Sequence, residues 1–200
     1  MKAFLAFVVA LLVASCGGST PKGEKLAPDA VILAFGDSLT HGTGASQSES
    51  YPAQLQGLIG RKVVNAGVPG ETSATGLARL PGVLDEVQPA MLLLCHGGND
   101  FLQKLGDEVA AANVRAMVKL ARERHIRVVL LATPKPSLPP SVPGFYREIA
   151  DAERVTFVET AMKEVLSDRA LKSDLVHPNG KGYGEIAKAV RKALEKAGAV

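Results

Sequence analysis

The sequence predicts a single α/β domain built on a mostly parallel sheet. Short apolar runs of strand-forming residues alternate with longer segments in which apolar residues recur at helical spacing. Two of the runs, residues 30–35 and 90–95, are apolar almost throughout, which is typical of parallel strands covered on both faces. The chain has 200 residues, of which 46% are hydrophobic and 22% charged, as expected for one globular domain. We therefore expect a three-layer α/β/α arrangement, flavodoxin-like, in which helices cover both faces of five strands.

Each element follows from its local pattern. Strands are expected at residues 30–35, 62–65, 90–95, 126–131 and 155–158, and helices at residues 51–59, 73–87, 107–124, 160–166 and 179–197. Pro52 suits the first turn of its helix, whereas Pro81 and Gly82 are expected to interrupt theirs. Asp107 is expected to cap the long helix that begins there. The predicted inward faces of the two longest helices are Val109, Ala112, Ala116, Met117 and Leu120, and Ile186, Ala187, Val190 and Leu194.

Residues 133–144 break this alternation. They contain five prolines and no regular periodicity, which predicts a stiff, extended loop after the fourth strand. Two interpretations stay open for this loop. It is either a plain surface connection or a wall of a substrate cleft, because loops at that edge of a parallel sheet commonly carry function.

The N-terminal segment is expected to lie outside the folded domain, which we assign to residues 29–200. Residues 1–15 have a positive start, an apolar run and small residues before Cys16, the pattern of a secretory signal peptide. Residues 13–16 also resemble the lipobox of bacterial lipoproteins, in which the cysteine is lipidated and becomes the new N-terminus. Plain cleavage nearby with a free Cys16 is the alternative. Residues 16–28, rich in small and polar residues, predict a flexible tether.

This N-terminal pattern predicts that the protein is located in the bacterial cell envelope. We expect it in the periplasm, held to the membrane by an N-terminal lipid. Gly17 follows the cysteine, which by resemblance to enterobacterial lipoproteins favours the outer membrane over the inner one.

Charge and residue pattern argue against several functions. The formal net charge is only +3 and is spread along the chain, so no nucleic-acid partner is expected. His41, His96 and His125 are scattered and lack paired carboxylates, so no metal site is predicted. The glycines match neither a phosphate loop nor a dinucleotide fingerprint, so no cofactor is expected. A monomer is the default expectation, and Cys95 is predicted to be a small buried apolar residue rather than a catalytic thiol.

The residues that carry chemistry lie near the two ends of the domain. Ser38 follows the first strand by way of Gly36 and Asp37, so its hydroxyl stands where open α/β sheets place their ligands. Asp174 and His177, three residues apart, can supply the orienting carboxylate and the base that a serine nucleophile needs. Capping of the last helix is the other interpretation of this pair, but a cap does not require an aspartate three residues before a histidine. We therefore predict a catalytic triad of Ser38, Asp174 and His177.

Four sequence blocks together resemble the SGNH (GDSL) hydrolase family. They are residues 35–40 (FGDSLT), 65–72 (NAGVPGET), 97–100 (GGND) and 174–178 (DLVHP). The resemblance is strongest to the bacterial acyl-CoA thioesterase, lysophospholipase and arylesterase branch. It implies that the oxyanion of an acyl transfer is bound by the backbone N–H groups of Ser38 and Gly70 and by the side-chain amide of Asn99. Taken singly, Gly70 could be a turn residue and Asn99 a helix cap.

Other polar residues in these blocks are expected to have structural roles. Asp37 is expected to hydrogen-bond backbone groups that shape the turn around Ser38, and Asp100 to be structural as well. His96 departs from the commonest family pattern, in which an apolar or small residue precedes this block. A semi-buried histidine with its hydrogen bonds satisfied is the preferred interpretation of His96, and a cleft-floor residue is the other.

The predicted function is that of a cofactor-free serine esterase. The resemblance implies hydrolysis of a carboxylic ester, thioester or lysophospholipid through an acyl-enzyme, with a small-molecule or lipid substrate. A carbohydrate O-acetylesterase acting on envelope polysaccharide is the enzymatic alternative, since the same fold and site serve both. A lipoprotein that binds envelope components without catalysis is the alternative from another class.

Overall fold

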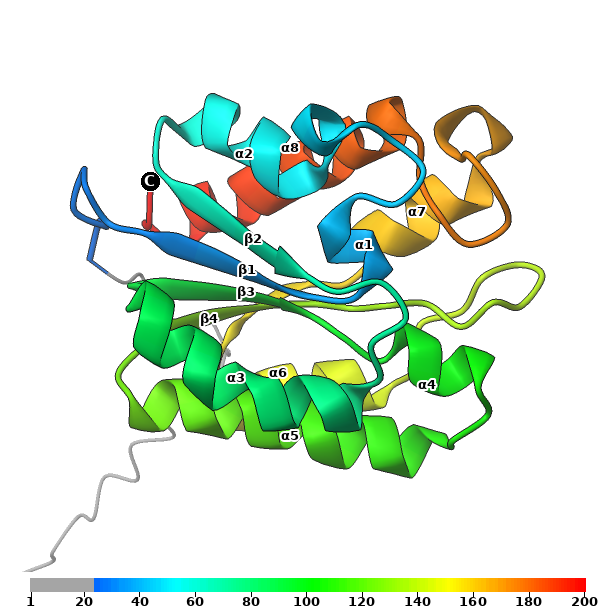
Figure 1. Ribbon diagram of the computed structural model, residues 1–200, viewed down its shortest axis with the longest axis horizontal. Coiled ribbons are helices and arrows are strands. Elements are labelled where there is room, and N and C mark those ends of the chain that lie inside the picture. Colours follow the sequence, from blue (N-terminus) through cyan, green and yellow to red (C-terminus); the bar gives the residue numbers. More distant parts are fainter. Residues whose placement is uncertain (1–23) are drawn as a thin grey trace, which may run out of the picture.

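A five-stranded parallel sheet forms the middle layer of the molecule (Figure 1). The computed structural model describes residues 24–200. The strands are β1 (Ile32–Gly36), β2 (Val63–Gly67), β3 (Met91–Cys95), β4 (Arg127–Leu131) and β5 (Thr156–Val158). Their order in the sheet is β2-β1-β3-β4-β5, and every neighbouring pair is parallel. The predicted three-layer, flavodoxin-like α/β fold is therefore confirmed.

Helices cover both faces of this sheet. They are α1 (Ser38–His41), α2 (Tyr51–Ile59), α3 (Ser73–Val87), α4 (Gly98–Leu102), α5 (Asp107–Glu123), α6 (Phe145–Glu153), α7 (Ala161–Ser167) and α8 (Gly180–Lys196), with short 3₁₀ turns η1 (Gln47–Glu49) and η2 (Arg169–Leu171). Figure 1 shows α2, α7 and α8 on one face and α3, α5 and α6 on the other. The short helices α1 and α4 lie at the carboxyl ends of β1 and β3.

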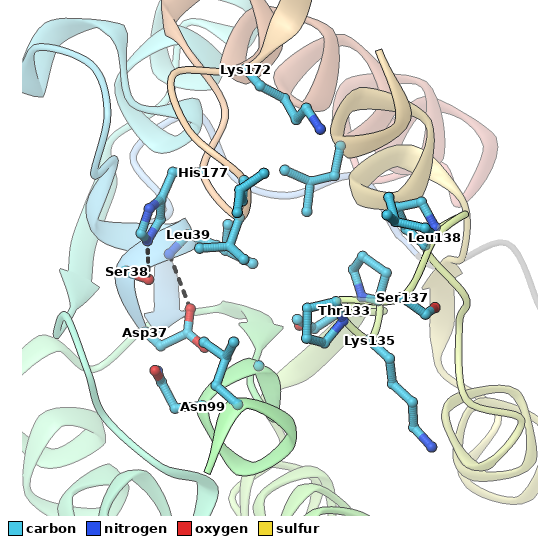
Figure 2. A pocket seen from close by; sticks show the side chains of 18 residues that line it. Asp37, Ser38, Leu39, Asn99, Thr133, Lys135, Ser137, Leu138, Lys172 and His177 are labelled. Atoms are coloured by element: carbon cyan, nitrogen blue, oxygen red, sulfur yellow. Dashed lines mark hydrogen bonds between the residues drawn. The ribbon is translucent and has the colours of Figure 1, made fainter. Parts of the chain in front are cut away.

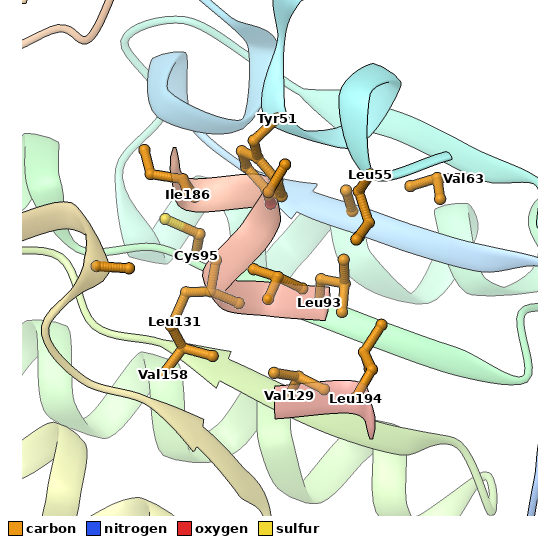
Figure 3. Packing of buried hydrophobic residues seen from close by; sticks show 14 of the residues in the cluster. Tyr51, Leu55, Val63, Leu93, Cys95, Val129, Leu131, Val158, Ile186 and Leu194 are labelled. Atoms are coloured by element: carbon orange, nitrogen blue, oxygen red, sulfur yellow. The ribbon is translucent and has the colours of Figure 1, made fainter. Parts of the chain in front are cut away.

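Each face of the sheet packs a separate hydrophobic cluster. Alternate residues of a strand point to opposite faces, so Ile32 contributes to the cluster under α8 while Leu33 contributes to the cluster under α5. The strands β1 and β3 are buried along their whole length. Figure 3 shows the cluster under α8, in which Leu93 and Val129 from the sheet lie near Leu194 of α8. The apolar runs of the sequence are thus explained by burial on two sides.

The short helices α1 and α4 were not predicted, and the predictions for the longer helices were wrong in three respects. The helix α6 was not expected, although its buried residues Phe145, Tyr146, Ile149 and Ala150 have helical spacing. Pro81 does not break α3, which continues to Val87. Leu80 and Leu84, on either side of Pro81 in this helix, are both buried in the core and hold the helix against the sheet.

The third error concerns the face of α5. Its buried residues are Ala110, Val114, Met117, Val118 and Ala121, a stripe rotated by about one position from the predicted one. Val109 is instead 43% exposed. Small alanines rather than larger apolar residues face the sheet at both ends of this stripe, which allows close packing of helix on sheet. The predicted cap was also wrong, because Gly106 occupies the cap position and Asp107 lies in the first helical turn. The predicted inward face of α8, in contrast, is confirmed.

The N-terminal predictions lie mostly outside the described residues. The signal peptide at residues 1–15, the lipidation of Cys16 and most of the predicted tether fall there. Leu26, within the segment expected to be the tether, is buried in the core and donates its N–H to the carbonyl of Ala199. Close contact with the domain therefore begins before residue 29. No helix within residues 24–200 has both the length and the apolar character needed to cross a membrane.

Candidate active site

A cavity of about 340 Å³ opens at the carboxyl ends of the strands, where Ser38, Asn99 and His177 lie along one side (Figure 2). Most of its other lining residues are apolar: Leu39, Leu102, Pro134, Pro136, Leu138, Pro140, Leu166, Leu175 and Val176. A volume in this range is typical of a small-molecule site. The cavity therefore joins a group of polar side chains to a mainly apolar wall.

The nucleophile candidate is held by a tight turn after β1. Gly36 is required there, because a Cβ at this position would overlap the carbonyl oxygen of Cys95 on β3. Asp37 is buried, and its carboxylate accepts a hydrogen bond of 3.0 Å from the N–H of Leu39. Burial raises the pKa of Asp37 above its usual value. Asp37 thus shapes the start of α1, as expected from the sequence, and Ser38 is the first residue of that helix.

Three predicted residues meet across the cavity edge although they are far apart in the sequence. The Nε2 atom of His177 lies 3.0 Å from the Oγ of Ser38, a contact drawn in Figure 2. The Nδ1 atom of the same ring lies 2.8 Å from Oδ2 of Asp174. Serine, imidazole and carboxylate therefore form a continuous hydrogen-bonded chain.

The ionisation of Asp174 fixes the direction of this chain. Partial burial tends to raise the pKa of Asp174, but the hydrogen bonds from His177 and from the N–H of Val176 outweigh it and lower the pKa. An ionised carboxylate only accepts hydrogen bonds, so the Nδ1 of His177 carries the proton. The Nε2 atom is then free to accept the proton of Ser38.

A closed loop presents Asp174 and His177. The Oδ1 atom of Asp174 accepts the N–H groups of Val176 and His177, each at 2.8 Å. The carbonyl of His177 in turn accepts the N–H of Ser173 at 3.0 Å. Asn179 then caps α8 by accepting the N–H of Gly182. Short-range hydrogen bonds between residues 173 and 182 thus hold the loop.

Hydrogen bonds connect the segments that carry the three predicted oxyanion donors, since the N–H of Val68 also donates to the carbonyl of Gly36 at 3.0 Å. The side-chain amide of Asn99 donates to the carbonyl of Glu71 at 2.9 Å, which ties α4 to the loop that carries Gly70. An amide has two N–H bonds, so the second remains for a ligand. Among residues 24–200, the backbone N–H groups of Ser38 and Gly70 donate to no other protein atom. The Gly70 backbone has φ +81°, a conformation that favours glycine.

Sequence reasoning missed a buried cluster behind these donors. Glu71 receives two hydrogen bonds from the guanidinium of Arg79, at 2.6 and 2.7 Å, and one of 3.1 Å from Nε2 of His96. Burial tends to raise the pKa of Glu71, but Arg79 and His96 lower it to about 2. The only sequence signal was two opposite charges, eight residues apart, around the start of a helix. Asp100 lies nearby and accepts the N–H and hydroxyl of Ser73, which is a structural role as expected.

The proline-rich segment lines the cavity, whereas Cys95 lies in the hydrophobic core. Residues 133–138 lie across it from Ser38 in Figure 2, so the segment forms a wall and is not a remote connection. The ammonium of Lys135 there pairs with Asp107 at 2.7 Å. Cys95 is fully buried in β3, and burial raises the pKa of its thiol to about 12, which agrees with the predicted packing role. Within the described part of the chain, no cluster of three or more His, Cys, Asp or Glu residues has metal-binding geometry.

The low pKa of Glu71 predicts an acid-sensitive contribution to stability. Its folded-state pKa of about 2 lies below the ordinary value of 4.5, so Glu71 stabilises the fold above about pH 4.5 and this stability is lost as the pH falls towards 2. A Glu71→Gln substitution should lower the free energy of unfolding by up to about 3 kcal/mol at pH 7, with a smaller effect at pH 3. Urea unfolding followed by circular dichroism at both pH values measures the free energy of unfolding. The control is Glu108→Gln, a change at an exposed residue of α5. A deficit that does not change with pH would contradict the assignment.

Comparison with known proteins supports the resemblance seen in the sequence. Residues 34–184 match the model of the GDSL-like lipase/acylhydrolase family. Esterase TesA of Pseudomonas aeruginosa is 31% identical over 183 residues, covering 84% of this chain and 89% of its own length. The Escherichia coli protein named thioesterase 1/protease 1/lysophospholipase L1 is 30% identical over 172 residues, covering 82% of this chain and 83% of its own.

The three-dimensional structure agrees with this relation. A crystal structure of TesA superposes with a TM-score of 0.75 at 28% sequence identity, covering 84% of this chain and 99% of that one. The family match extends from the middle of β1 into α8 and includes all four sequence blocks. The chain therefore belongs to the GDSL-like lipase/acylhydrolase family, also called SGNH hydrolases, whose named relatives here are ester-bond hydrolases.

Proposed function

We propose that the protein is a serine esterase that hydrolyses carboxylic esters through an acyl-enzyme. The observation that carries the proposal is the hydrogen-bonded chain from Ser38 through His177 to Asp174 at the edge of the cavity. A binding protein that had lost catalysis would be expected to lack or displace one of these groups. All three are present and in contact, which favours the enzyme.

The geometry supports a specific order of events. Ser38 attacks the ester carbonyl while His177 takes its proton at Nε2, and Asp174 stabilises the imidazolium that forms. The negative oxygen of the tetrahedral intermediate is bound by the N–H groups of Ser38 and Gly70 and by the free N–H of Asn99, each such donor being worth roughly 3 kcal/mol of barrier. His177 then gives its proton to the leaving alcohol. Water then attacks the acyl carbonyl while the same ring takes its proton, and the ring returns this proton to the Oγ of Ser38 as the bond to the acid breaks.

Removal of the nucleophile tests this mechanism. Ser38→Ala should lower kcat for p-nitrophenyl acetate by at least about 10³-fold, since the remaining groups give only residual catalysis. Asp174→Asn should lower kcat by about 10²- to 10⁴-fold, because an amide no longer favours the required tautomer of His177. Release of p-nitrophenolate measures both rates, and Ser48→Ala, an exposed serine away from the cavity, is the matched control. Equal rates for Ser38→Ala and the wild type would refute the proposal.

The character of the cavity wall supports acyl esters over sugar acetates. Its leucines and prolines offer apolar contacts to an acyl chain but few hydrogen-bonding groups to the hydroxyls of a sugar. The names of the relatives, among them thioesterase and lysophospholipase, are consistent with such substrates for those proteins. Carbohydrate O-acetylesterase activity is the second candidate, because a single acetyl group would also fit.

Chain length and alcohol type separate these two candidates. We expect kcat/KM for p-nitrophenyl butyrate to exceed that for the acetate, since each buried methylene contributes about 0.8 kcal/mol, or nearly fourfold. Activity on acetylated xylan should be far below both. Leu102→Ser, in the cavity wall, should reduce the preference for butyrate, whereas Leu58→Ser on α2 should not. Faster hydrolysis of the acetylated polysaccharide than of butyrate would favour the second candidate.

We also propose, from the sequence alone, that the enzyme is attached to the cell envelope by a lipid on Cys16. Mass spectrometry of the full chain expressed in a Gram-negative bacterium should find a mature N-terminus at this cysteine, with the mass of its acyl groups. Cys16→Ser should leave the precursor unlipidated. An unmodified cysteine, or a mature chain that starts elsewhere, would rule out the anchor.

A further inference from the structure

The hydrogen bonds of the buried Glu71 cluster connect the two loops that carry the proposed oxyanion donors. Glu71 directly follows Gly70, and its backbone carbonyl accepts the amide of Asn99 at 2.9 Å. Its carboxylate is held by His96 at 3.1 Å, and His96 lies three residues before Asn99. The side chain and the backbone of Glu71 therefore both bind the loop that follows β3. A shift of Glu71 would move Gly70 and release Asn99 at the same time.

The surrounding residues anchor this connection to the rest of the fold. The guanidinium of Arg79 on α3 binds the carboxylate of Glu71 and also the carbonyl of Ala66 on β2, at 3.0 Å. The hydroxyl of Tyr146 on α6 donates to the carbonyl of His96 at 2.6 Å. Glu71 and His96 are thus held by α3 and α6, and Arg79 in turn is tied to β2; none of these three elements lines the cavity.

The packing around His96 leaves room for its imidazole ring. The ring is fully buried, and a Cβ at Gly76 on α3 would overlap its Nε2 atom, so a glycine is needed opposite it. Since Nε2 donates to the Glu71 carboxylate, it carries a proton. The other nitrogen, Nδ1, is buried with no hydrogen-bond partner within the described chain.

An unsatisfied buried nitrogen costs stability, and an apolar side chain of similar size would avoid this cost. Packing alone therefore does not account for a histidine at position 96. What the histidine supplies, and an apolar side chain cannot, is the hydrogen bond to Glu71.

We propose that His96 is a positioning residue for catalysis: by holding the Glu71 carboxylate, it fixes Gly70 and Asn99 in the geometry that binds the oxyanion. The inference rests on the esterase function proposed above. It assigns His96 no contact with substrate and no proton transfer. It predicts an effect on the chemical step rather than on substrate binding, because an oxyanion exists only after attack by Ser38.

Two variants of His96 separate positioning from packing. His96→Leu removes the donor while keeping a similar volume, and should lower kcat for p-nitrophenyl acetate by about 10- to 100-fold with KM within about twofold of the wild type. Its melting temperature should fall by less than that of Glu71→Gln, because Arg79 still pairs with the carboxylate and the unsatisfied nitrogen is gone. His96→Gln retains an N–H donor and should recover a large part of kcat. His125→Asn, a change at an exposed helix end, is the matched control.

A double-mutant cycle tests whether His96 acts through Glu71. If it does, adding His96→Leu to Glu71→Gln should reduce kcat by less than threefold beyond the single Glu71→Gln variant. A full multiplicative loss would contradict this route. A kcat for His96→Leu equal to that of the wild type, or a lower melting temperature with no change in kcat, would overturn the proposal.

The Ser38→Ala variant, assayed in parallel, keeps the two hypotheses distinct. If Ser38→Ala abolishes activity and His96→Leu has no effect, only the positioning role fails. If Ser38→Ala retains full activity, the proposed function itself fails.

Discussion

The register of the three central strands is the constraint on which the site depends. Gly36, the last residue of β1, is paired with Gly67 at the end of β2 and with Cys95 at the end of β3. Parallel strands that stop in one row deliver their following loops to one edge of the sheet. Ser38, Gly70 and Asn99 follow these three strands by two to four residues. Strand pairing therefore brings the three residues to one edge, and the hydrogen bonds of Glu71 between the loops then hold Gly70 and Asn99 there.

The proposed orienting carboxylate and base are held in place differently. Asp174 and His177 belong to no strand or helix, and their loop is fixed by bonds within itself and by the start of α8. The large-scale fold needs only to bring this loop to the sheet edge. The carboxylate of Asp174 serves twice, because one oxygen closes the turn and the other orients the imidazole. The side-chain position that closes the turn is thus also the one that places a carboxylate oxygen beside the His177 ring.

Much of this arrangement could be predicted from the sequence, because the strands are apolar runs and the candidate triad has a distinctive chemistry and order. The helix α6 was not predicted, because it follows a proline-rich loop and its stripe of buried residues, from Phe145 to Ala150, is short. The stripe of α5 was placed one position off since alanine is a weak marker of burial. Glu71 and His96 could not be paired, because they lie 25 residues apart and charge patterns along a chain do not reveal contacts between separate loops.

The proline-rich wall of the cavity affects how substitutions can alter substrate preference. Prolines restrict the unfolded chain, so ordering residues 133–144 costs less conformational entropy than ordering a flexible loop of the same length. Side chains such as Ser137 and Leu138 project from this stiff backbone beside the cavity. Substitutions at these positions can alter the surface offered to a substrate without disturbing the backbone that carries them. The loop thus provides a fixed frame on which substrate preference can diverge while the catalytic edge stays intact.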